Sequence, residues 1–474
     1  MNTLKRTKIV ATLGPATSAR STIKQMILEG VNVCRINFSH AVHADLVETI
    51  KTIREIDHEL GTHTGILGDL QGPKIRIGNL HSEPILLEAG HQIIFTTKAY
   101  LGDKDKVHIN YQDFPKDVTV GDKVLIDDGK LVFKVISSNG NDEAVLEAVY
   151  GGPLNSRKGV NLPDTKISMP SLTPKDIADL DFALSQNIHW IGLSFVRKAN
   201  DIHELRAIIE ANEKDCRIIA KIEKPEALKN LDDIIEATDG VMVARGDLGV
   251  EIPLEQVPLV QKEIVKKCQQ MAKPVIIATQ MMESMIDNIT PSRAEVNDVA
   301  NAVMDGADAV MLSGETSVGE HPVEVIKVMS RIIKQTETFE GIYNAKFQPL
   351  INTQRFISDN ICFGALDLAE KVNAKAIVTL TFSGYTTLKV ASFRPKAGVY
   401  VFTGNRRLLK MMSLVWGTRT FYYDKFGSTD ETIEDIKVIL RDSEHLEEDD
   451  LIINIASMPI KSKGMSNMIR LSYI

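Results

Sequence analysis

Two segments in which an apolar run turns charged, AKIEKPE and MVARGDLG, carry the side chains best suited to chemistry in this sequence. Lys221 and Glu223 are two residues apart, so on a strand both point to the same face. Burying such a pair is costly for stability alone, which favours a functional role over a structural ion pair. Glu223 and Asp247 add two hard oxygen ligands of the kind that Mg²⁺ (or Mn²⁺) binds, with water and substrate oxygens in its other positions.

Groups that bind anions accompany these carboxylates. Arg35 and Arg76 are candidate phosphate ligands because a guanidinium keeps its charge and offers forked donors, although an ordinary surface arginine is the alternative. The glycines of ARGDLG would let backbone N–H groups point at an anion such as a carboxylate. The sequence contains neither GxxxxGK[ST] nor GxGxxG, so a nucleotide would be held by a lid with basic residues instead of a P-loop or dinucleotide fold.

The elements that must position these residues are short apolar runs that alternate with longer helix-like segments. Eight such runs are predicted strands: 8–14, 31–38, 65–70, 190–195, 217–223, 240–245, 274–280 and 308–314. Runs such as VIIA and AVML are apolar at consecutive positions, as expected of strands covered on both faces. The pattern predicts a closed (β/α)8 TIM barrel, with an open doubly wound sheet as the competing arrangement.

In such barrels the active site lies at the carboxyl ends of the strands. The polar residues that end or follow these strands are Arg35, Asn37, Ser39, His40, Asp69, Lys74, Arg76, Lys221, Glu223, Arg245, Asp247, Thr279, Ser313 and Glu315. Each alone is most simply a solvated loop residue or a helix cap. Their convergence on one rim favours an active site.

The alternation breaks once, between the third and fourth strands. Short alternating runs with turn signals there predict a small antiparallel β-barrel domain inserted as a lid. Helix and strand alternate again near the C-terminus, which predicts a separate α/β domain. The expected segments are 1–72 and 170–345 for the barrel, 73–169 for the lid and 353–474 for the C-terminal α/β domain.

Composition limits the class of protein. Of 474 residues, 43% are hydrophobic and 25% charged, which is typical of folded globular chains. A net charge of −8 argues against general binding of nucleic acid or anionic membrane. Four scattered cysteines, no apolar run of membrane-spanning length and a polar opening segment predict a cytoplasmic protein with reduced thiols.

The motifs together resemble those of pyruvate kinases over essentially the full length. The matching segments are TKIVATLGPAT, VCRINFSH, KGVNLP, AKIEKPE, MVARGDLGVEIP, ATQMMESM, PSRAEVNDVANAVMDGADAVMLSGET and GEHPVE. The resemblance implies transfer of phosphate from phosphoenolpyruvate to ADP, which gives ATP and pyruvate in the last step of glycolysis.

The resemblance also implies residue roles. Lys221 would neutralise charge on the transferred phosphoryl group, and Arg35 would bind the phosphate. Glu223 and Asp247 would hold Mg²⁺, while the amides of Gly246 and Asp247 receive the substrate carboxylate. Thr279 would lie near the enolate carbon that is protonated. The residues expected at the nucleotide are Asn37, His40, Arg76 and Lys158.

One segment departs from the best-known members, which have a DTKGPEIRT-like run where this chain has DLQGPKIRI. In the family this region, with Asn37, Ser39 and Asp69, helps bind an activating K⁺, and the glutamate lies beside it. The ammonium of Lys74 supplies an equivalent fixed charge. We therefore expect Lys74 to replace K⁺, against the alternative that the ion still binds.

In the family the C-terminal domain is regulatory, and a phosphosugar effector often binds a Thr/Ser-rich loop that corresponds to TFSGYTT, 381–387. Phe382 stands where the family has an effector-loop lysine, and the segment SMPIKSKGMSN lacks the Trp and Arg of members activated by fructose bisphosphate. The sequence therefore leaves the effector open between a phosphosugar and a nucleotide. A homotetramer is the assembly that the resemblance implies.

Two rival functions remain at this stage. Another Mg²⁺-dependent barrel that handles an enolate, such as a phosphoenolpyruvate mutase or a citrate-lyase-type aldolase, would not need Lys158 on an inserted lid. A catalytically dead barrel kept as a sensor would be expected to have lost Lys221, Glu223 or Asp247, and the sequence keeps all three.

Overall fold

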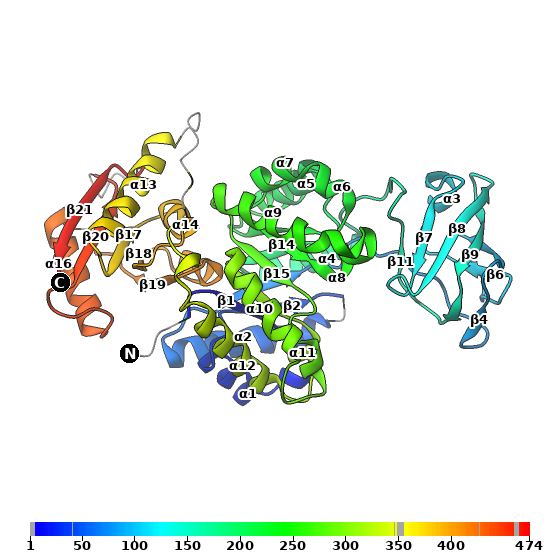
Figure 1. Ribbon diagram of the computed structural model, residues 1–474, viewed down its shortest axis with the longest axis horizontal. Coiled ribbons are helices and arrows are strands. Elements are labelled where there is room, and N and C mark those ends of the chain that lie inside the picture. The colour runs from blue at the N-terminus through cyan, green and yellow to red at the C-terminus, as the bar shows by residue number, and fades with distance from the viewer. Residues whose placement is uncertain (1–4, 40, 346, 348–354, 426, 459–463) are drawn as a thin grey trace.

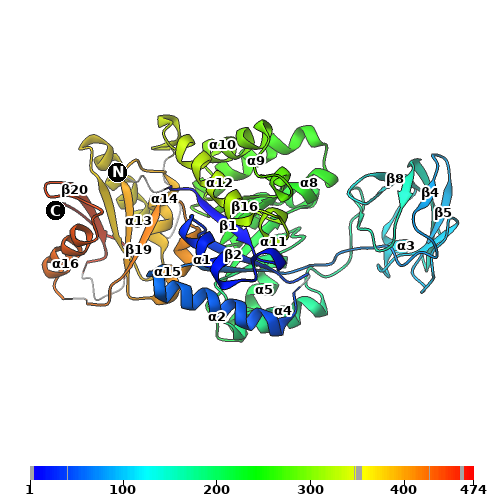
Figure 2. The ribbon, with the colours of Figure 1, turned by 90° about the horizontal axis from the view of Figure 1, so that it is seen from below.

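The computed structural model describes residues 5–39, 41–345, 347, 355–425, 427–458 and 464–474. Three parts follow one another along the long axis of the molecule, with a barrel in the middle (Figure 1). The β domain inserted in the barrel lies at one end and the C-terminal domain at the other, as Figure 2 also shows. The predicted α/β class, with a TIM barrel, an inserted β domain and a C-terminal α/β domain, is confirmed.

Eight parallel strands close the barrel in the order β1-β16-β15-β14-β13-β12-β3-β2. They are β1 (Lys8–Thr12), β2 (Val33–Asn37), β3 (Gly65–Asp69), β12 (Trp190–Leu193), β13 (Arg217–Ile222), β14 (Gly240–Ala244), β15 (Val275–Ala278) and β16 (Ala309–Leu312). Each lies within a predicted strand, so the closed barrel replaces the open-sheet alternative.

Helices surround this barrel and connect its strands. They are α1 (Arg20–Leu28), α2 (His43–Leu60), α4 (Pro174–Ser185), α5 (Ala199–Ala211), α6 (Pro225–Lys229), α7 (Leu231–Ala237), α8 (Arg245–Glu251), α9 (Val257–Gln270), α10 (Arg293–Asp305), α11 (Gly314–Ser317) and α12 (Pro322–Thr336). Two of the longer ones begin with reciprocal capping boxes, Thr173 with Asp176 and Ser292 with Glu295, which satisfy free N–H groups of the first turn.

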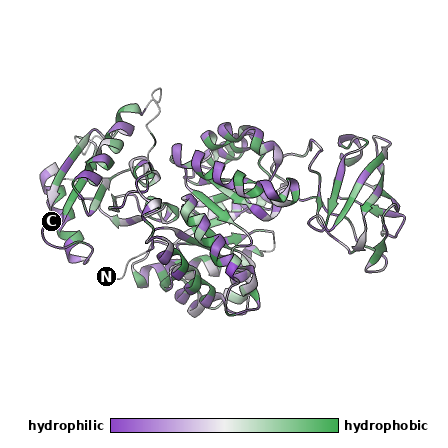
Figure 3. Ribbon diagram, viewed as in Figure 1, coloured by the Kyte–Doolittle hydropathy of each residue, from purple (hydrophilic) through white to green (hydrophobic). Residues whose placement is uncertain are grey.

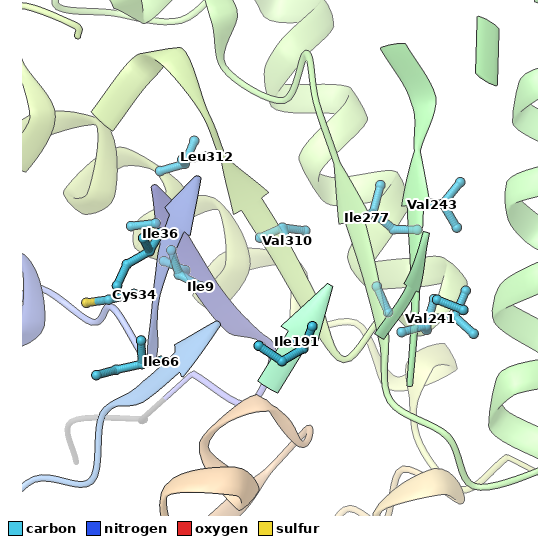
Figure 4. Packing of buried hydrophobic residues seen from close by; sticks show 14 of the residues in the cluster. Ile9, Cys34, Ile36, Ile66, Ile191, Val241, Val243, Ile277, Val310 and Leu312 are labelled. Carbon is cyan, nitrogen blue, oxygen red and sulfur yellow. The ribbon is translucent and has the colours of Figure 1, made fainter. Parts of the chain in front are cut away.

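Alternate residues of each strand face opposite sides of the barrel wall. One set packs against the surrounding helices, and Figure 4 shows Ile9, Ile36 and Val310 in this set. The other set, which includes Val33 and Ile219, fills the barrel interior in layers. Figure 3 shows the resulting apolar strands at the centre, with polar residues on the outer helix faces.

The inserted domain is a small β structure. Its elements are β4 (Ile85–Leu87), β5 (Gln92–Thr96), β6 (Lys106–His108), α3 (Phe114–Asp117), β7 (Lys123–Ile126), β8 (Leu131–Ser138), β9 (Glu143–Tyr150), β10 (Gly152–Leu154) and β11 (Val160–Asn161). Six strands pair in the order β11-β7-β8-β9-β5-β6, and β10 pairs with β4. The pairs are antiparallel except β5 with β6, which is parallel.

The C-terminal domain is a five-stranded sheet flanked by helices. Its elements are α13 (Phe356–Lys371), β17 (Ala376–Leu380), α14 (Tyr385–Ser392), β18 (Gly398–Thr403), α15 (Arg406–Met411), η5 (Met412–Leu414), β19 (Thr418–Tyr422), α16 (Thr429–Asp442), β20 (Leu451–Ala456) and β21 (Met468–Tyr473). The strand order is β19-β18-β17-β20-β21, with only β21 antiparallel to its neighbour among the described residues.

This domain closes the barrel at the amino ends of the strands. Apolar residues of α15 and η5, such as Leu408 and Met412, belong to the same buried cluster as the interior strand residues. Lys8, the first residue of β1, donates to the carbonyl of Thr418 at 2.9 Å. One end of the barrel is therefore sealed, and only the carboxyl end is left for a site.

The expected segment boundaries, 1–72, 73–169, 170–345 and 353–474, stay predictions. No helix in the described part of the chain has the length and apolar character needed to cross a bilayer.

Candidate active site

The interior rows of three strands change from apolar to charged toward their carboxyl ends. On β2 the row passes from Val33 to Arg35, on β3 from Leu67 to Asp69, and on β13 from Ile219 to Lys221. The period of two that fills the barrel with apolar side chains therefore also delivers the charges to its open rim.

Lys221 is the centre of this charged cluster. Its ammonium lies 3.0 Å from Oε1 of Glu223 and 3.2 Å from Oδ1 of Asp69, and it donates to the hydroxyl of Ser194 at 2.7 Å. Only 11% of the Lys221 side chain is exposed. The ammonium is thus fixed in place by three oxygens before any ligand arrives, which is how a site preorganises charge.

Arg35 extends the cluster across the barrel mouth. Its Nη2 lies 2.6 Å from Oδ2 of Asp69, its Nε donates to the same oxygen at 2.8 Å, and its Nη1 donates to Thr12 at 2.9 Å. Asp69 therefore lies between two cations. The rim carries two fixed positive charges around one fully buried carboxylate, a suitable place for a phosphate.

The pKa shifts agree with this arrangement. Burial alone would lower the pKa of Lys221, but the charges of Asp69 and then Glu223 outweigh it and raise that pKa above its usual value. Burial would raise the pKa of Asp69, yet Lys221 and Arg35 hold it below normal. Lys221 therefore stays charged throughout the physiological range.

Glu223 shifts in the other direction. Burial, the largest cause, raises its pKa to about 7, with a further contribution from the charge of Asp247 and only partial relief from Lys221. The ammonium is shared with Asp69, so it does not fully compensate the second carboxylate. The negative charge of Glu223 is therefore only partly compensated, and a second cation beside it would stabilise its ionised form.

The Glu223 and Asp247 pair fits a divalent cation. Both are hard oxygen donors, and the repulsion between them that raises the pKa of Glu223 is what a bound cation would relieve. No group of three or more His, Cys, Asp or Glu residues that could hold a metal occurs in the described ranges. This pair would therefore share the ion with substrate oxygens and water.

Gly246 and Thr279 are brought together. The backbone N–H of Gly246, in the first turn of α8, donates to Oγ1 of Thr279 at 2.7 Å. Thr279 has a φ of 68°, a left-handed conformation that costs energy for a β-branched residue. The chain thus turns sharply after β15, which brings the hydroxyl against the start of α8.

The four residues expected at the nucleotide are distributed over the rim and the lid. Asn37 accepts from the N–H of Ser39 at 3.1 Å, and His40 lies outside the described residues. Arg76 is bridged to Gly159 on the lid side and donates to the carbonyl of Arg157. Lys158 pairs with Asp127 at 2.9 Å. Arg76 and Lys158 are thus close neighbours in the inserted domain.

Lys74 is exposed and lines a pocket between lid and barrel that also includes Asp128, Lys224 and Asp247. Within the described ranges its ammonium has no carboxylate within 4.0 Å. No hydrogen bond or ion pair joins Lys74 to Asn37, Ser39 or Asp69 in the described part of the chain. Its positive charge is thus available at the same opening as Asp247.

Sequence reasoning missed three supporting residues. Ser194 binds the Lys221 ammonium and donates to the carbonyl of Leu70 at 2.7 Å. The N–H of Phe195 donates to Oε2 of Glu223 at 2.8 Å, with Phe195 at a φ of 54°. Thr12 accepts from Arg35. All three lie within the last three residues of a predicted strand, 8–14 or 190–195, so the rule that strand ends carry the site could have found them.

Comparison with known proteins agrees with this geometry. The family model "Pyruvate kinase, barrel domain" matches residues 4–326, and "Pyruvate kinase, alpha/beta domain" matches residues 359–472. A pyruvate kinase of Corynebacterium efficiens is 43% identical over 465 residues, which cover 98% of this chain and 97% of that protein. One from Geobacillus stearothermophilus is 41% identical and covers 99% of this chain and 80% of its own length.

A solved structure is also similar over nearly the whole chain. The crystal structure of a pyruvate kinase from Cryptosporidium parvum superposes with a TM-score of 0.92 at 35% identity, covering 99% of this chain and 96% of that chain. Family matches in both the barrel and the C-terminal domain, together with relatives above 40% identity over nearly the whole length, lead to one conclusion. The chain belongs to the pyruvate kinase family.

Proposed function

We propose that this chain transfers the phosphoryl group of phosphoenolpyruvate to ADP, giving ATP and pyruvate in the last step of glycolysis. The observation that carries the proposal is the ammonium of Lys221, held between Asp69 and Glu223 at the open rim. Phosphoryl transfer depends mainly on positioning and on stabilising charge, and a buried, preoriented ammonium supplies both.

The substrate phosphate would lie between Arg35 and Lys221. Each already has a carboxylate partner in Asp69, so their positions are fixed and little rearrangement is needed when an anion arrives. Glu223 and Asp247 would hold the Mg²⁺ (or Mn²⁺), which when bound supplies positive charge to the oxygens of phosphate and carboxylate. The amides of Gly246 and Asp247, at the start of α8, would receive the carboxylate.

Loss of the phosphoryl group leaves an enolate, and a proton must reach its terminal carbon to give pyruvate. Thr279 would deliver the proton, relayed from solvent, because its hydroxyl lies at the start of α8 where the carboxylate is bound. In the present arrangement that hydroxyl accepts from Gly246. The same hydroxyl donates to the carbonyl of Ala278 at 2.6 Å, so it would have to give up this bond, and the bond from Gly246, to turn toward the enolate.

The nucleotide would bind between rim and lid. Arg76 and Lys158 on the lid side carry the charge for the phosphates, with Asn37 and His40 bordering the pocket. The lid extends away from the barrel (Figure 1), so these side chains would approach the rim as the lid closes. The basic residues of the lid also favour a kinase over the mutase and aldolase alternatives, because those enzymes do not need a basic lid.

Lys74 would make the reaction independent of K⁺. Its exposed ammonium lines the same pocket as Asp247, so it adds one fixed positive charge to that opening. The alternative, in which K⁺ still binds through Asn37, Ser39 and Asp69, has weaker support, because the Asp69 carboxylate is already paired with Arg35 and Lys221.

Regulation and assembly are proposed on family grounds. A pocket in the C-terminal domain is lined by Arg355, Thr381, Ser383 and Ser466, hydroxyl groups and one cation that suit the phosphate of a phosphosugar or nucleotide effector. A homotetramer in the cytoplasm completes the proposal. Four buried free cysteines are compatible with a reducing compartment.

The test is pyruvate formation from phosphoenolpyruvate and ADP with Mg²⁺, in tetraethylammonium buffer with and without K⁺. Equal activity in both buffers is expected. Activity only with K⁺ would keep the kinase and overturn the role of Lys74. No activity in either buffer, even with sugar phosphates added, would return the question to the rival enolate chemistries.

A further inference from the structure

A buried ion pair that the reaction does not use lies at the far end of α8. The side chain of Glu251 is 1% exposed and that of Lys224 is 9% exposed, and their charged groups are in direct contact. The same Oε1 of Glu251 also accepts from Nδ2 of Asn161 at 2.8 Å. Oε2 of Glu251 is buried and has no hydrogen-bond partner among the described residues.

The three residues come from three elements with different tasks. Glu251 ends α8, the helix whose first turn contains Gly246 and Asp247. Lys224 directly follows Glu223, and its ammonium lies 5.9 Å above the ring of Phe195, whose N–H binds Glu223. Asn161 belongs to the lid strand β11, three residues after Lys158. The cluster therefore joins the lid to both carboxylate-bearing elements.

A second part of the lid lies close to α8 beside this cluster. A side chain added at Gly129 would lie 3.9 Å from Val250, the neighbour of Glu251. Gly129 belongs to the tight turn that carries Asp127, the partner of Lys158. The lid is thus hydrogen-bonded to the last turn of α8 through Asn161, and the turn with Gly129 lies close to the same part of the helix.

Stability alone does not explain a buried pair of this kind. Removing a lysine and a glutamate from water costs about as much as their attraction returns, and here one carboxylate oxygen is left without a donor. Such pairs are better suited to fixing one geometry among several. The geometry that this one fixes is the position of β11 relative to α8.

We propose that Glu251, held by Lys224, is the pivot on which the lid turns, and that Asn161 is its attachment on the lid. These are positioning residues: they set where Lys158 and Arg76 arrive over the rim, and so they govern the nucleotide more than phosphoenolpyruvate. The proposal rests on the proposed function, because it assigns the lid to ADP. The barrel alone carries Arg35, Lys221 and the carboxylates.

The first variant is Asn161→Ala, which removes the attachment and leaves the ion pair intact. We expect the KM for ADP and the dissociation constant of Mg²⁺-ADP to rise about tenfold, with the KM for phosphoenolpyruvate within twofold. Gln92→Ala is the matched control, because that amide contacts Glu147 within the lid and is exposed. It should leave all constants within twofold.

Two double variants separate the attachment from the charges. Glu251→Gln with Lys224→Met removes both charges but keeps an amide oxygen for Asn161, and we expect constants within threefold of the wild type. Glu251→Leu with Lys224→Met keeps a similar volume but removes the acceptor, and should reproduce the tenfold effect on ADP. Both avoid an unpaired buried charge, so both should fold.

Binding is measured by calorimetry with Mg²⁺-ADP alone, and turnover separately. An equal rise in both KM values, or a fall in thermal stability with unchanged ADP affinity, would overturn the pivot while leaving the kinase intact. In another outcome the wild type binds ADP, and the variants change the dissociation constant of Mg²⁺-ADP as expected, while no pyruvate is formed. That result would retain the pivot and overturn the proposed reaction. A chain that does not bind ADP would overturn both.

Discussion

The two ends of the barrel both bury charge, and they do so for different purposes. At the sealed end, the carboxylate of Asp308 accepts from the N–H of Trp416 at 3.0 Å, from the N–H of Val275 at 3.1 Å and from Nη2 of Arg394 at 2.8 Å. At the open end, Lys221 lies between Asp69 and Glu223. The first cluster joins two domains, and the second faces solvent and ligands.

The difference lies in how completely the charges are matched. Both oxygens of Asp308 are bound by donors of the protein, two of them backbone groups that cannot leave. At the open end two carboxylates share one ammonium, and the pKa of Glu223 stays raised. A buried cluster whose charges are all paired within the protein stabilises the fold. A cluster with an uncompensated carboxylate charge is suited to binding a ligand.

Replacing Lys221 should give the largest effect. Lys221→Met removes the ammonium that would stabilise the transferred phosphoryl group, and we expect turnover to fall by about 10³-fold. The fold should survive, because Asp69 keeps Arg35 and Glu223 can bind a proton. Steady-state kinetics and a thermal unfolding curve measure the two quantities. Turnover within tenfold of wild type would remove Lys221 from this role.

Breaking the sealed end should give the opposite pattern. Arg394→Met leaves the Asp308 carboxylate buried without its cation, and we expect the free energy of unfolding to fall by roughly 3 kcal/mol. Turnover per folded molecule should stay within twofold. Lys396→Met is the control, since its pair with Glu340 is mostly exposed and worth well under about 1 kcal/mol. Lost turnover with unchanged stability would contradict the comparison.

Metal binding should depend on pH at the open end. Glu223 must be ionised to bind Mg²⁺, and burial raises its pKa to about 7, so the apparent affinity should weaken about tenfold for each pH unit below 7. Calorimetric titration with Mg²⁺ from pH 8 to pH 5.5 measures this.

The matched variant is Asp247→Asn. It removes the neighbouring charge that raises the pKa of Glu223, so its weaker binding should decline at lower pH than that of the wild type. Affinity that stays constant down to pH 5.5 in the wild type would show that Glu223 is not the titrating ligand.

The barrel could be predicted because each of its strands has a recognisable local pattern of apolar residues in the sequence. Runs such as VIIA show strands covered on both faces, and the change from apolar to charged within AKIEKP marks the rim. Strand β21 is not among the strands predicted above, because the alternation in MIRLSY is that of a half-exposed edge strand and lacks the continuous apolar run of the barrel strands.

The site could be predicted only as a set of residues on one rim. That Lys221 is shared between Asp69 and Glu223 depends on which strands are neighbours around the barrel, and no local pattern records this. The attachment of Asn161 to Glu251 joins residues 90 positions apart in different domains. The sequence pattern predicts which residues lie at the ends of strands. The strand order of the closed barrel determines which of their side chains are in contact.

The smallest effect is expected at the sealed end, from Lys8. Burial, with the charge of Arg419, lowers its pKa to about 8 from a usual 10.5. Between these pH values the unfolded chain binds more protons than the folded protein, so this residue makes stability rise with pH over that window. The difference in unfolding free energy between wild type and Lys8→Met should therefore increase by on the order of 1 kcal/mol from pH 8 to pH 9.5.

Denaturant unfolding at several pH values measures that difference, and using the variant cancels the titration of all other groups. Turnover should follow neither curve, because Lys8 reaches the carbonyl of Thr418 and lies at the opposite end from Lys221. Parallel stability curves would mean that Lys8 keeps its proton in the folded protein. The ammonium of Lys8 would then be stabilised by protein groups at the sealed end, as the carboxylate of Asp308 is.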